Sequence, residues 1–208
     1  MRRSPRYLSQ WGDLACNHAV IERREDPATL HDWRADGYAS AEEYRRWSLN
    51  TCGIACLQSV LSDLGHPEQP KATLLRRAVA TGALVPQDDG AIDGMFYRPF
   101  AEWVRADYGI EAVVRGVLEV DELSSRVASG DWYAIASVSS EIRWPDRRPS
   151  RRGGHLVLVH DVRDGRLVFH NPSGLGPTAA DARCLPESFA HFFAGRGIFV
   201  RRSSCDSS

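Results

Sequence analysis

The chain has 208 residues, enough to enclose one sizeable hydrophobic core, and no repeat or linker divides it. Hydrophobic residues make up 43% and charged residues 25%, as in an ordinary soluble globular domain. The formal net charge of −1 gives no overall basic field to attract nucleic acid or an anionic membrane, so we expect neither as a partner. Only Lys71 is a lysine among the 26 basic residues, a bias that we attribute to a GC-rich genome and not to phosphate binding.

The sequence also lacks the patterns of export and membrane insertion. No stretch approaches the roughly 20 apolar residues that a membrane-spanning helix needs. The positively charged residues 1–7 are not followed by an apolar run, so we expect no secretory signal. Five cysteines form an odd count without a disulfide-rich pattern: Cys16, Cys52, Cys56, Cys184 and Cys205. We therefore expect a reduced, cytoplasmic setting.

The first half of the chain is predicted to be helical. Residues 1–47 show no clean periodicity before position 41, and we expect loops and short helices there. A longer helix is then marked by three residues that can cap its start: Ser48, Asn50 and Thr51. Apolar residues repeat at helical spacing until Gly65 closes the helix. Cys52 lies in its first turn, where the helix dipole favours the thiolate and predicts a thiol pKa below the usual value of about 8.5.

The second half changes from helices to strands. Helices are predicted over 71–80 and 97–108, with a turn over 88–90 between them. Strands are then expected over 110–117, 132–139, 156–162, 166–170 and 198–201, with helices over 121–128 and 187–193. Helices followed by an antiparallel sheet predict an α+β fold with two lobes. We expect one domain over 1–202 and a disordered tail over 203–208.

Three short motifs point to a nucleophilic enzyme. A cysteine on a helix, followed about 100 residues later by a histidine and an asparagine, is the order found in papain-like enzymes. Here the helix begins Cys52-Gly-x-x-Cys-Leu, a strand begins at Gly154-His155, and a hairpin ends at Asn171-Pro172. Together these motifs resemble the bacteriocin-processing, double-glycine-leader cysteine peptidases, many of whose relatives are stand-alone proteins. The resemblance covers roughly residues 7–202 and implies a papain-like fold, with a helical lobe packed on a sheet lobe.

The residue types assign the chemical roles. Cys52 is the predicted nucleophile, which would form an acyl-enzyme with a peptide or ester carbonyl. His155 is the predicted general base, and Asn171 would orient its ring. Cys56 could instead form a metal or redox pair with Cys52, but the histidines lack the spacing of a zinc site. We therefore expect no metal and no cofactor, and interpret Cys56 as a small core residue.

The role of Asn171 depends on the register of the hairpin between it and His155. A two-residue turn at Asp164-Gly165 would pair Leu158 with Asn171 and place Asn171 on the face opposite His155. His170 would then share the face of His155. A three-residue loop with a bulge, or an equivalent slip by one residue, would place Asn171 diagonal to His155 on one face. We predict the bulged three-residue loop.

The oxyanion hole needs a donor besides the backbone amide of Cys52. The resembled family usually supplies a glutamine upstream of the cysteine, and papain-like enzymes often place it about six residues before. Arg46 and Trp47 stand there instead. The segment around Gln10 resembles the glutamine-bearing segment that opens many stand-alone members, so we assign this role to Gln10, with a long insertion before Cys52. Ser48 or Asn50 could substitute for it.

A basic loop over 143–152 runs directly into His155. Such a run is usually only a solvated loop. Its place beside the expected cleft also makes it a candidate dock for an acidic leader peptide or carrier protein. The substrate-binding residues would be Arg147, Arg148, Arg151 and Arg152.

These features favour a soluble cysteine peptidase or amidohydrolase that acts on a peptide or a carrier-bound acyl substrate. An acyl- or peptidyl-transferase of a biosynthetic pathway would use the same residues, because an amine can intercept the acyl-enzyme. A catalytically degenerate peptide-binding module is the third alternative. The absence of a glutamine just before Cys52 favours it, and the intact Cys52, His155 and Asn171 argue against it. The sequence predicts neither the identity of the substrate nor the oligomeric state.

Overall fold

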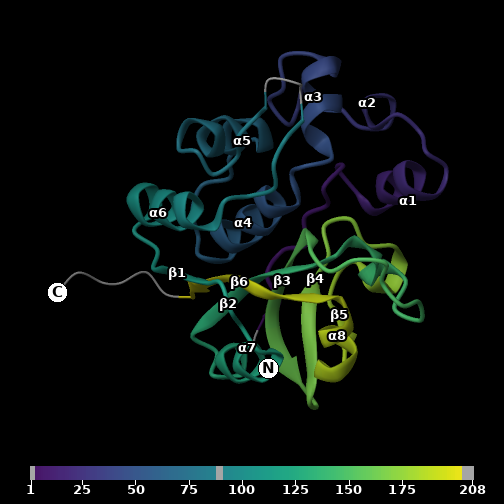
Figure 1. Ribbon diagram of the computed structural model, residues 1–208. Helices are drawn as coiled ribbons and strands as arrows, with labels where there is room; N and C mark the ends of the chain where they lie inside the picture. Colours follow the sequence, from purple (N-terminus) through teal and green to yellow (C-terminus); the bar gives the residue numbers. More distant parts are fainter. Residues whose placement is uncertain (1–2, 88–90, 203–208) are drawn as a thin grey trace.

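A six-stranded antiparallel sheet forms the centre of the protein, with helices on both of its faces (Figure 1). The computed structural model describes residues 3–87 and 91–202, so the predicted turn over 88–90 and the predicted tail over 203–208 lie outside the described residues. The strand order is β1-β6-β2-β3-β4-β5, and every neighbouring pair is antiparallel. This arrangement confirms the predicted α+β fold.

The elements follow one another in an order that separates helices from strands. The N-terminal half contains α1 (Leu14–Glu22), α2 (Pro27–Leu30), α3 (Ala41–Ser48), α4 (Cys52–Asp63), α5 (Lys71–Ala80) and α6 (Tyr97–Tyr108). The sheet consists of β1 (Ala112–Arg115), β2 (Trp132–Ser139), β3 (Gly154–Arg163), β4 (Arg166–His170), β5 (Ala182–Cys184) and β6 (Phe193–Arg201). Between the strands lie α7 (Val120–Ala128), α8 (Pro186–Phe192) and the 3₁₀ helices η1 (Ser140–Arg143) and η2 (Gly176–Thr178).

Two hydrophobic cores lie on opposite faces of the sheet. On one face, side chains of α4, α5 and α6 pack against alternate strand residues such as Ile135 and Leu158. On the other face, α7 and α8 cover the intervening residues, such as Val157 and Phe199. Because both faces are covered, every residue of β2 is buried. The sheet therefore holds β3 rigidly beneath α4.

Most predicted elements coincide with observed ones, because periodicity and end signals agree there. The helices over 71–80 and 97–108 and the strands over 132–139 and 166–170 have the predicted bounds. The helix α6 ends at a glycine in the left-handed region, Gly109 with φ of 66°. Within the described residues, no helix is both long enough and apolar enough to span a membrane.

The differences have local causes. Strand β6 begins five residues earlier than predicted, because Gly195 and Gly197 interrupt the apolar pattern that marks a strand. Strand β5 has only three residues and was not predicted from the sequence. Before Cys52, the expected short helices are α1, α2 and α3, and Asp13 caps α1 through its side chain. This helical insertion separates Gln10 from Cys52 in the sequence.

Candidate active site

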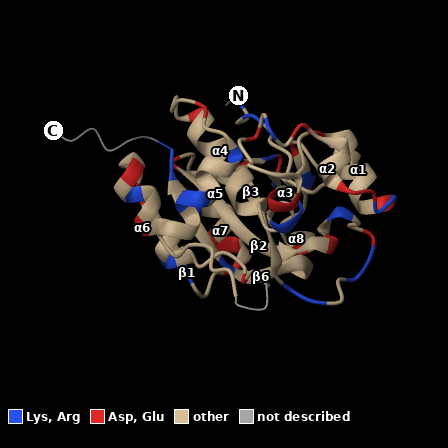
Figure 2. Cartoon of the chain, turned by 90° about the horizontal axis from the view of Figure 1, so that it is seen from above, with Lys and Arg blue, Asp and Glu red and all other residues tan. Residues whose placement is uncertain are grey.

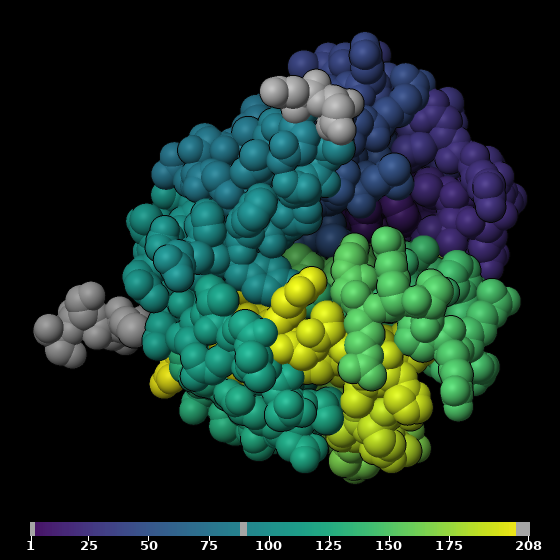
Figure 3. Space-filling model, viewed as in Figure 1, coloured from purple at the N-terminus to yellow at the C-terminus, as the bar shows by residue number. Residues whose placement is uncertain are grey.

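A cleft of about 600 Å³ opens between the helical part and the sheet. It is lined by residues 49, 50, 52 and 53 around the start of α4, residues 93–97 before and within α6, residues 154–156 of β3, and single residues of β2 and β6. The hollow in the middle of Figure 3, where blue, teal, green and yellow surfaces meet, is this cleft. Cys52 and His155 both line it, so the fold brings the predicted nucleophile and base to one surface.

Cys52 is the first residue of α4. Thr51 occupies the N-cap position, but its side chain makes no cap hydrogen bond and donates instead to the carbonyl of Ser48, at 3.1 Å. The first-turn amides of α4 are thus left without a side-chain cap, and the Cys52 sulfur accepts hydrogen bonds from the backbone amides of Gly53 and Leu156. The thiol is therefore held against β3 at Leu156, the residue that follows His155.

His155 and Asn171 are joined directly. The Nε2 atom of His155 lies 2.8 Å from Oδ1 of Asn171, and both residues are buried. Since an amide oxygen only accepts, Nε2 carries the proton and the lone pair of the ring lies on Nδ1. Asn171 itself is fixed, because its backbone amide donates to the carbonyl of Ala179 at 2.8 Å. The ring is thus oriented through Nε2, and Nδ1 is its basic atom.

The register of the hairpin combines both alternatives considered above. The turn has two residues, Asp164 and Gly165, with φ of 51° and 70°, so the prediction of a three-residue loop was wrong. A slip by one residue occurs instead between Val159 and Asp161, where β3 contains a β-bulge at His160. Leu158 consequently faces His170, which places Asn171 diagonal to His155 on the same face. The equivalent one-residue slip is confirmed, at a different position.

Burial keeps both Cys52 and His155 uncharged in the free protein. The pKa of the Cys52 thiol is raised by burial, although hydrogen bonds from the Leu156 and Gly53 amides and the charge of Arg143 act in the opposite direction. The prediction of a lowered thiol pKa was therefore wrong, because loss of solvation outweighs the helix terminus. Burial also lowers the pKa of His155 to about 4. Near neutral pH the site contains a thiol and an uncharged imidazole.

Two residues that sequence reasoning missed complete the site. The hydroxyl of Ser173 lies 3.1 Å from Nε2 of His155, and its backbone amide donates to Oδ1 of Asn171 at 3.2 Å. Arg143, at the end of η1, donates through Nη2 to this hydroxyl at 2.6 Å. Its largely buried charge opposes protonation of His155 and favours the Cys52 thiolate. For Ser173, the only sequence feature that pointed to this role was its position shortly after Asn171.

Gln10 reaches the mouth of α4 despite the insertion before Cys52. Its backbone amide donates to the carbonyl of Pro172 at 2.8 Å, and its side-chain Nε2 donates to the carbonyl of Ser48 at 2.7 Å. One of the two Nε2 hydrogens is used in this way. Gln10 itself is buried and is not among the residues that line the cleft. Of the two substitutes considered, Asn50 lines the cleft, whereas the hydroxyl of Ser48 is buried without a hydrogen-bond partner among the described residues.

The basic loop lies outside the Cys52 cleft. After η1 it forms a separate hollow of about 480 Å³, lined by Arg148, Pro149, Ser150, Arg151, Arg152 and His191. Figure 2 shows this loop in blue near α8 and β6. Arg147 does not line the hollow, and its guanidinium lies 5.2 Å from the ring centre of Trp144. Three of the four predicted arginines thus share one surface next to the start of β3.

A second polar cluster was not predicted from the sequence. His160, His170 and Asp181 place potential metal-ligating atoms within 4.8 Å of one another, the one such group of three in the described residues. Both ring nitrogens of His170 already have backbone partners: Nε2 donates to the carbonyl of Pro5 at 2.8 Å, and Nδ1 accepts from the amide of Asp181 at 3.1 Å. The cluster therefore fixes the N-terminal segment to the sheet through His170.

Comparisons with known proteins bear on the fold of the chain. No family model and no curated protein matches the sequence. Among solved structures, a C39-like peptidase from Bacillus anthracis aligns with a TM-score of 0.52 and 14% identity, over 74% of this chain and 90% of that one. The protein has the fold of the C39 papain-like peptidases. The peptidase domain of Streptococcus ComA, a bifunctional ABC transporter of a quorum-sensing pathway, aligns with a TM-score of 0.49 and 16% identity, over 73% and 91% of the two chains.

Proposed function

We propose that this protein is a cysteine hydrolase that cleaves a peptide or acyl bond through an acyl-enzyme on Cys52. The observation that carries the proposal is the 2.8 Å contact between His155 and Asn171 on the wall of the cleft that Cys52 also lines. A buried histidine with an oriented ring and a cysteine thiol that line the same cleft are the groups that nucleophilic catalysis requires. The C39-like fold supports the same reading.

The neutral resting pair defines the first step. As Cys52 attacks the carbonyl carbon, His155 accepts the thiol proton on Nδ1, so that charge develops only when substrate is present. The oxygen of the tetrahedral intermediate receives hydrogen bonds from the Cys52 amide and the free Nε2 hydrogen of Gln10. The imidazolium then donates its proton to the leaving group, which departs and leaves the acyl-enzyme. Water, deprotonated by His155, releases the acid.

The finer proposal concerns the substrate. We infer that a leader peptide with a small-residue cleavage site, or an acyl group on a carrier protein, enters the cleft while its acidic part lies on the basic loop. Arg148, Arg151 and Arg152 support this inference, because they line one exposed hollow next to the strand that carries His155. Acidic residues of a partner would find several guanidinium groups there, which can each bind a carboxylate in a bidentate manner.

The test uses a short peptide thioester that ends in Gly-Gly, because a thioester acylates a catalytic thiol without the rest of a natural substrate. We expect intact-mass spectrometry to show one acyl group on Cys52 and chromatography to show release of the thiol and then of the free acid. Cys52→Ala and His155→Ala should abolish turnover. Cys184→Ala, which changes a thiol on β5 outside the cleft, is the matched control and should retain full activity.

Adding glycinamide distinguishes hydrolysis from acyl transfer. Release of free acid in its presence supports a hydrolase, whereas dominant formation of the amide would assign a transferase. No acylation of Cys52, or acylation that persists in His155→Ala at the wild-type rate, would overturn the enzymatic proposal in favour of a binding module.

A further inference from the structure

Lys71 occupies an unusual position for a charged residue. It is the only lysine of the chain, it opens α5, and only 4% of its surface is exposed. Burial lowers its pKa, and a positive charge at a helix N-terminus opposes the helix dipole. Lysines are almost never fully buried unless they are paired. Some specific set of contacts must therefore hold this ammonium group in place.

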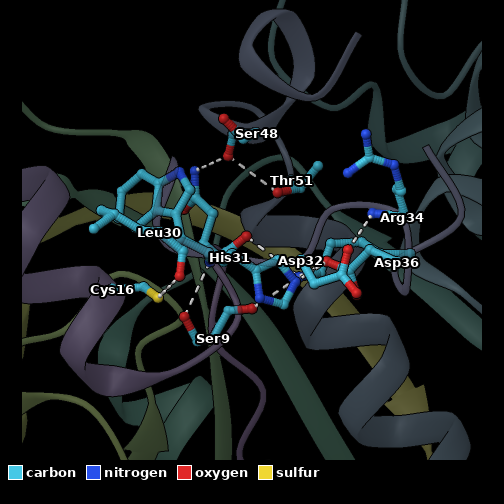
Figure 4. A network of polar contacts seen from close by, with 12 residues as sticks. Ser9, Cys16, Leu30, His31, Asp32, Arg34, Asp36, Ser48 and Thr51 are labelled. Carbon is cyan, nitrogen blue, oxygen red and sulfur yellow. Dashed lines mark hydrogen bonds and ion pairs between the residues drawn. The ribbon is translucent and has the colours of Figure 1, made fainter. Parts of the chain in front are cut away.

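Three acceptors surround the ammonium group. Its Nζ atom lies 3.2 Å from the carbonyl oxygen of Ser9, 3.3 Å from that of Gln10 and 3.3 Å from Oδ2 of Asp36. Three acceptors match the three N–H groups of a lysine. Asp36 is itself fixed, because its Oδ2 lies 2.9 Å from Nε2 of His31 and its carbonyl accepts from the amide of Ala72 at 2.9 Å. Figure 4 shows Ser9, His31 and Asp36 within this network, with Ser48 and Thr51 at its other edge.

These contacts complete the support of Gln10. Its amide is bound by Pro172 in the segment after β4, its side chain by Ser48 in the turn that enters α4, and its carbonyl by Lys71. The first two contacts belong to segments that also carry Asn171 and Cys52. Lys71 supplies the third, from α5. A change at Lys71 would thus remove the contacts of the Ser9 and Gln10 carbonyls while leaving Cys52 and His155 in place.

The type of residue is informative in this chain. All 25 other basic residues are arginine, yet this position carries lysine. A guanidinium is planar and brings five donors in a fixed fork, so it would leave donors unpaired in a site that offers three acceptors. A compact ammonium on a flexible stem satisfies all three. The site therefore selects lysine against the strong arginine bias of the sequence.

We propose that Lys71 is a positioning residue for the oxyanion hole: it fixes the Ser9–Gln10 backbone so that the free Nε2 hydrogen of Gln10 points to the oxygen of the tetrahedral intermediate. The proposal rests on the proposed function, because it presumes attack by Cys52. It predicts that loss of Lys71 lowers stabilisation of the intermediate and not the reactivity of the thiol.

Two reagents separate these effects. A peptide aldehyde ending in Gly-glycinal adds the Cys52 thiol across its carbonyl, forming a carbon–sulfur bond and a hemithioacetal whose oxygen occupies the oxyanion hole. Iodoacetamide alkylates the same sulfur by displacing iodide and develops no such oxygen. In Lys71→Met we expect the aldehyde to bind roughly 10- to 100-fold more weakly and kcat for the thioester to fall by a similar factor, since a lost oxyanion donor costs about 10²–10³. KM and the rate of alkylation should stay within about twofold of wild type.

Matched variants make the test specific. Arg77→Met removes a basic side chain from the exposed side of the same helix and should behave as wild type. Gln10→Ala should weaken aldehyde binding at least as much as Lys71→Met, and the double variant should add little to Gln10→Ala alone, because both remove one interaction. Lys71→Arg should show part of the same loss.

The single lysine gives a second readout that needs no variant at this position. Protein labelled with ¹³C at lysine Cε has one such NMR signal, and we expect it to shift when the aldehyde binds to wild type and to stay unchanged in Gln10→Ala. If Lys71→Met binds the aldehyde like wild type, if alkylation falls in parallel with aldehyde binding, or if the Lys71 signal does not respond, the positioning role is overturned. If wild type forms no adduct on Cys52, the proposed function fails and this inference fails with it.

Discussion

Among single residues, Arg143 has the widest electrostatic influence on the site. Its guanidinium is largely buried, and burial lowers its pKa to about 10, so it is still charged at neutral pH. This charge disfavours a proton on His155 and favours a negative charge on Cys52. Arg143 thus lowers both pKa values and helps to keep the imidazole free to act as a base. The hydrogen bond to Ser173 holds the charge in place.

Replacing this arginine should change the pH dependence of activity. In wild type, kcat/KM for the thioester should fall only as pH approaches about 4, where His155 becomes protonated. In Arg143→Met the pKa of His155 rises, so the acidic limb should move to higher pH, by roughly one unit for each 1.4 kcal/mol of lost repulsion. The measurement is the pH profile of kcat/KM from pH 4 to 8.

The control for this prediction is an arginine outside the cleft. Arg183→Met removes an exposed charge on β5 and should leave the acidic limb unchanged. An acidic limb of Arg143→Met that coincides with that of wild type would show that the charge of Arg143 does not reach His155.

At the scale of secondary-structure elements, the hairpin β3–β4 shows what sequence analysis can achieve. Strand β3 begins two residues earlier than predicted and the turn has two residues instead of the predicted three, but the bounds of β4 and the place of the turn at Asp164-Gly165 follow from residue types. The bulge at His160 does not, because a bulged residue needs no special side chain. The face on which Asn171 lies was therefore predictable only from the requirement that it reach His155.

The insertion before Cys52 illustrates a second kind of limit. Gln10 could be assigned by resemblance, but its position at the mouth of α4 depends on contacts with Ser48, Lys71 and Pro172. These partners are far from Gln10 in the sequence, and two of them act through backbone carbonyls, which carry no residue signature. In the same way, the helix-mouth position of Cys52 was predictable, whereas the raised thiol pKa depends on burial by the complete fold.

The basic loop is the element whose role is most open to a direct kinetic test. If it docks an acidic partner, a variant with neutral residues at four positions should raise KM and leave kcat nearly unchanged, because binding is lost equally in ground and transition states. The four changes are Arg147→Gln, Arg148→Gln, Arg151→Gln and Arg152→Gln. The substrate is the Gly-Gly thioester preceded by several glutamates.

Salt and a matched substrate provide the control. For wild type, kcat/KM should fall with added salt, because exposed charges are screened over about 8 Å at physiological ionic strength. The same thioester with glutamine in place of glutamate should show neither the salt effect nor a difference between wild type and variant. An unchanged KM for the acidic thioester would identify the loop as solvated surface only.

For the whole molecule, buried neutral histidines link stability to pH. Burial lowers the pKa to about 4 in His155 and to about 3 in His160, and it also lowers the pKa of His170, against about 6.5 in an unfolded chain. Below pH 6.5 the unfolded chain therefore binds protons that the folded protein does not. The free energy of unfolding should decrease as pH falls below 6.5, by up to about 1.4 kcal/mol per pH unit for each histidine, and these groups should have no effect above it.

Urea unfolding between pH 7.5 and 4.5 measures this slope. The range avoids the carboxylates of Asp36 and Asp161, whose pKa values are lowered in the folded state, so that their contribution is lost only at more acidic pH. His160→Gln removes one of these three histidines, one that lies outside the cleft. It should reduce the slope of the unfolding free energy against pH by about one third. A slope equal to that of wild type would show that His160 is not neutral in the folded protein.

The backbone hydrogen bond between Gln10 and the distant Pro172 also bears on protein synthesis. A nascent chain contains the α4 thiol about 100 residues before His155 and Asn171 are translated, which is roughly 5–20 s at about 5–20 residues per second. The N-terminal segment cannot take its final place until Pro172 has emerged, and β2 lacks its partner β6 until residues 193–201 have emerged as well. Cys52 is therefore translated long before the residues that orient His155 and hold Gln10, and the cleft is complete only once β6, which contributes Arg196 to its lining, has been translated.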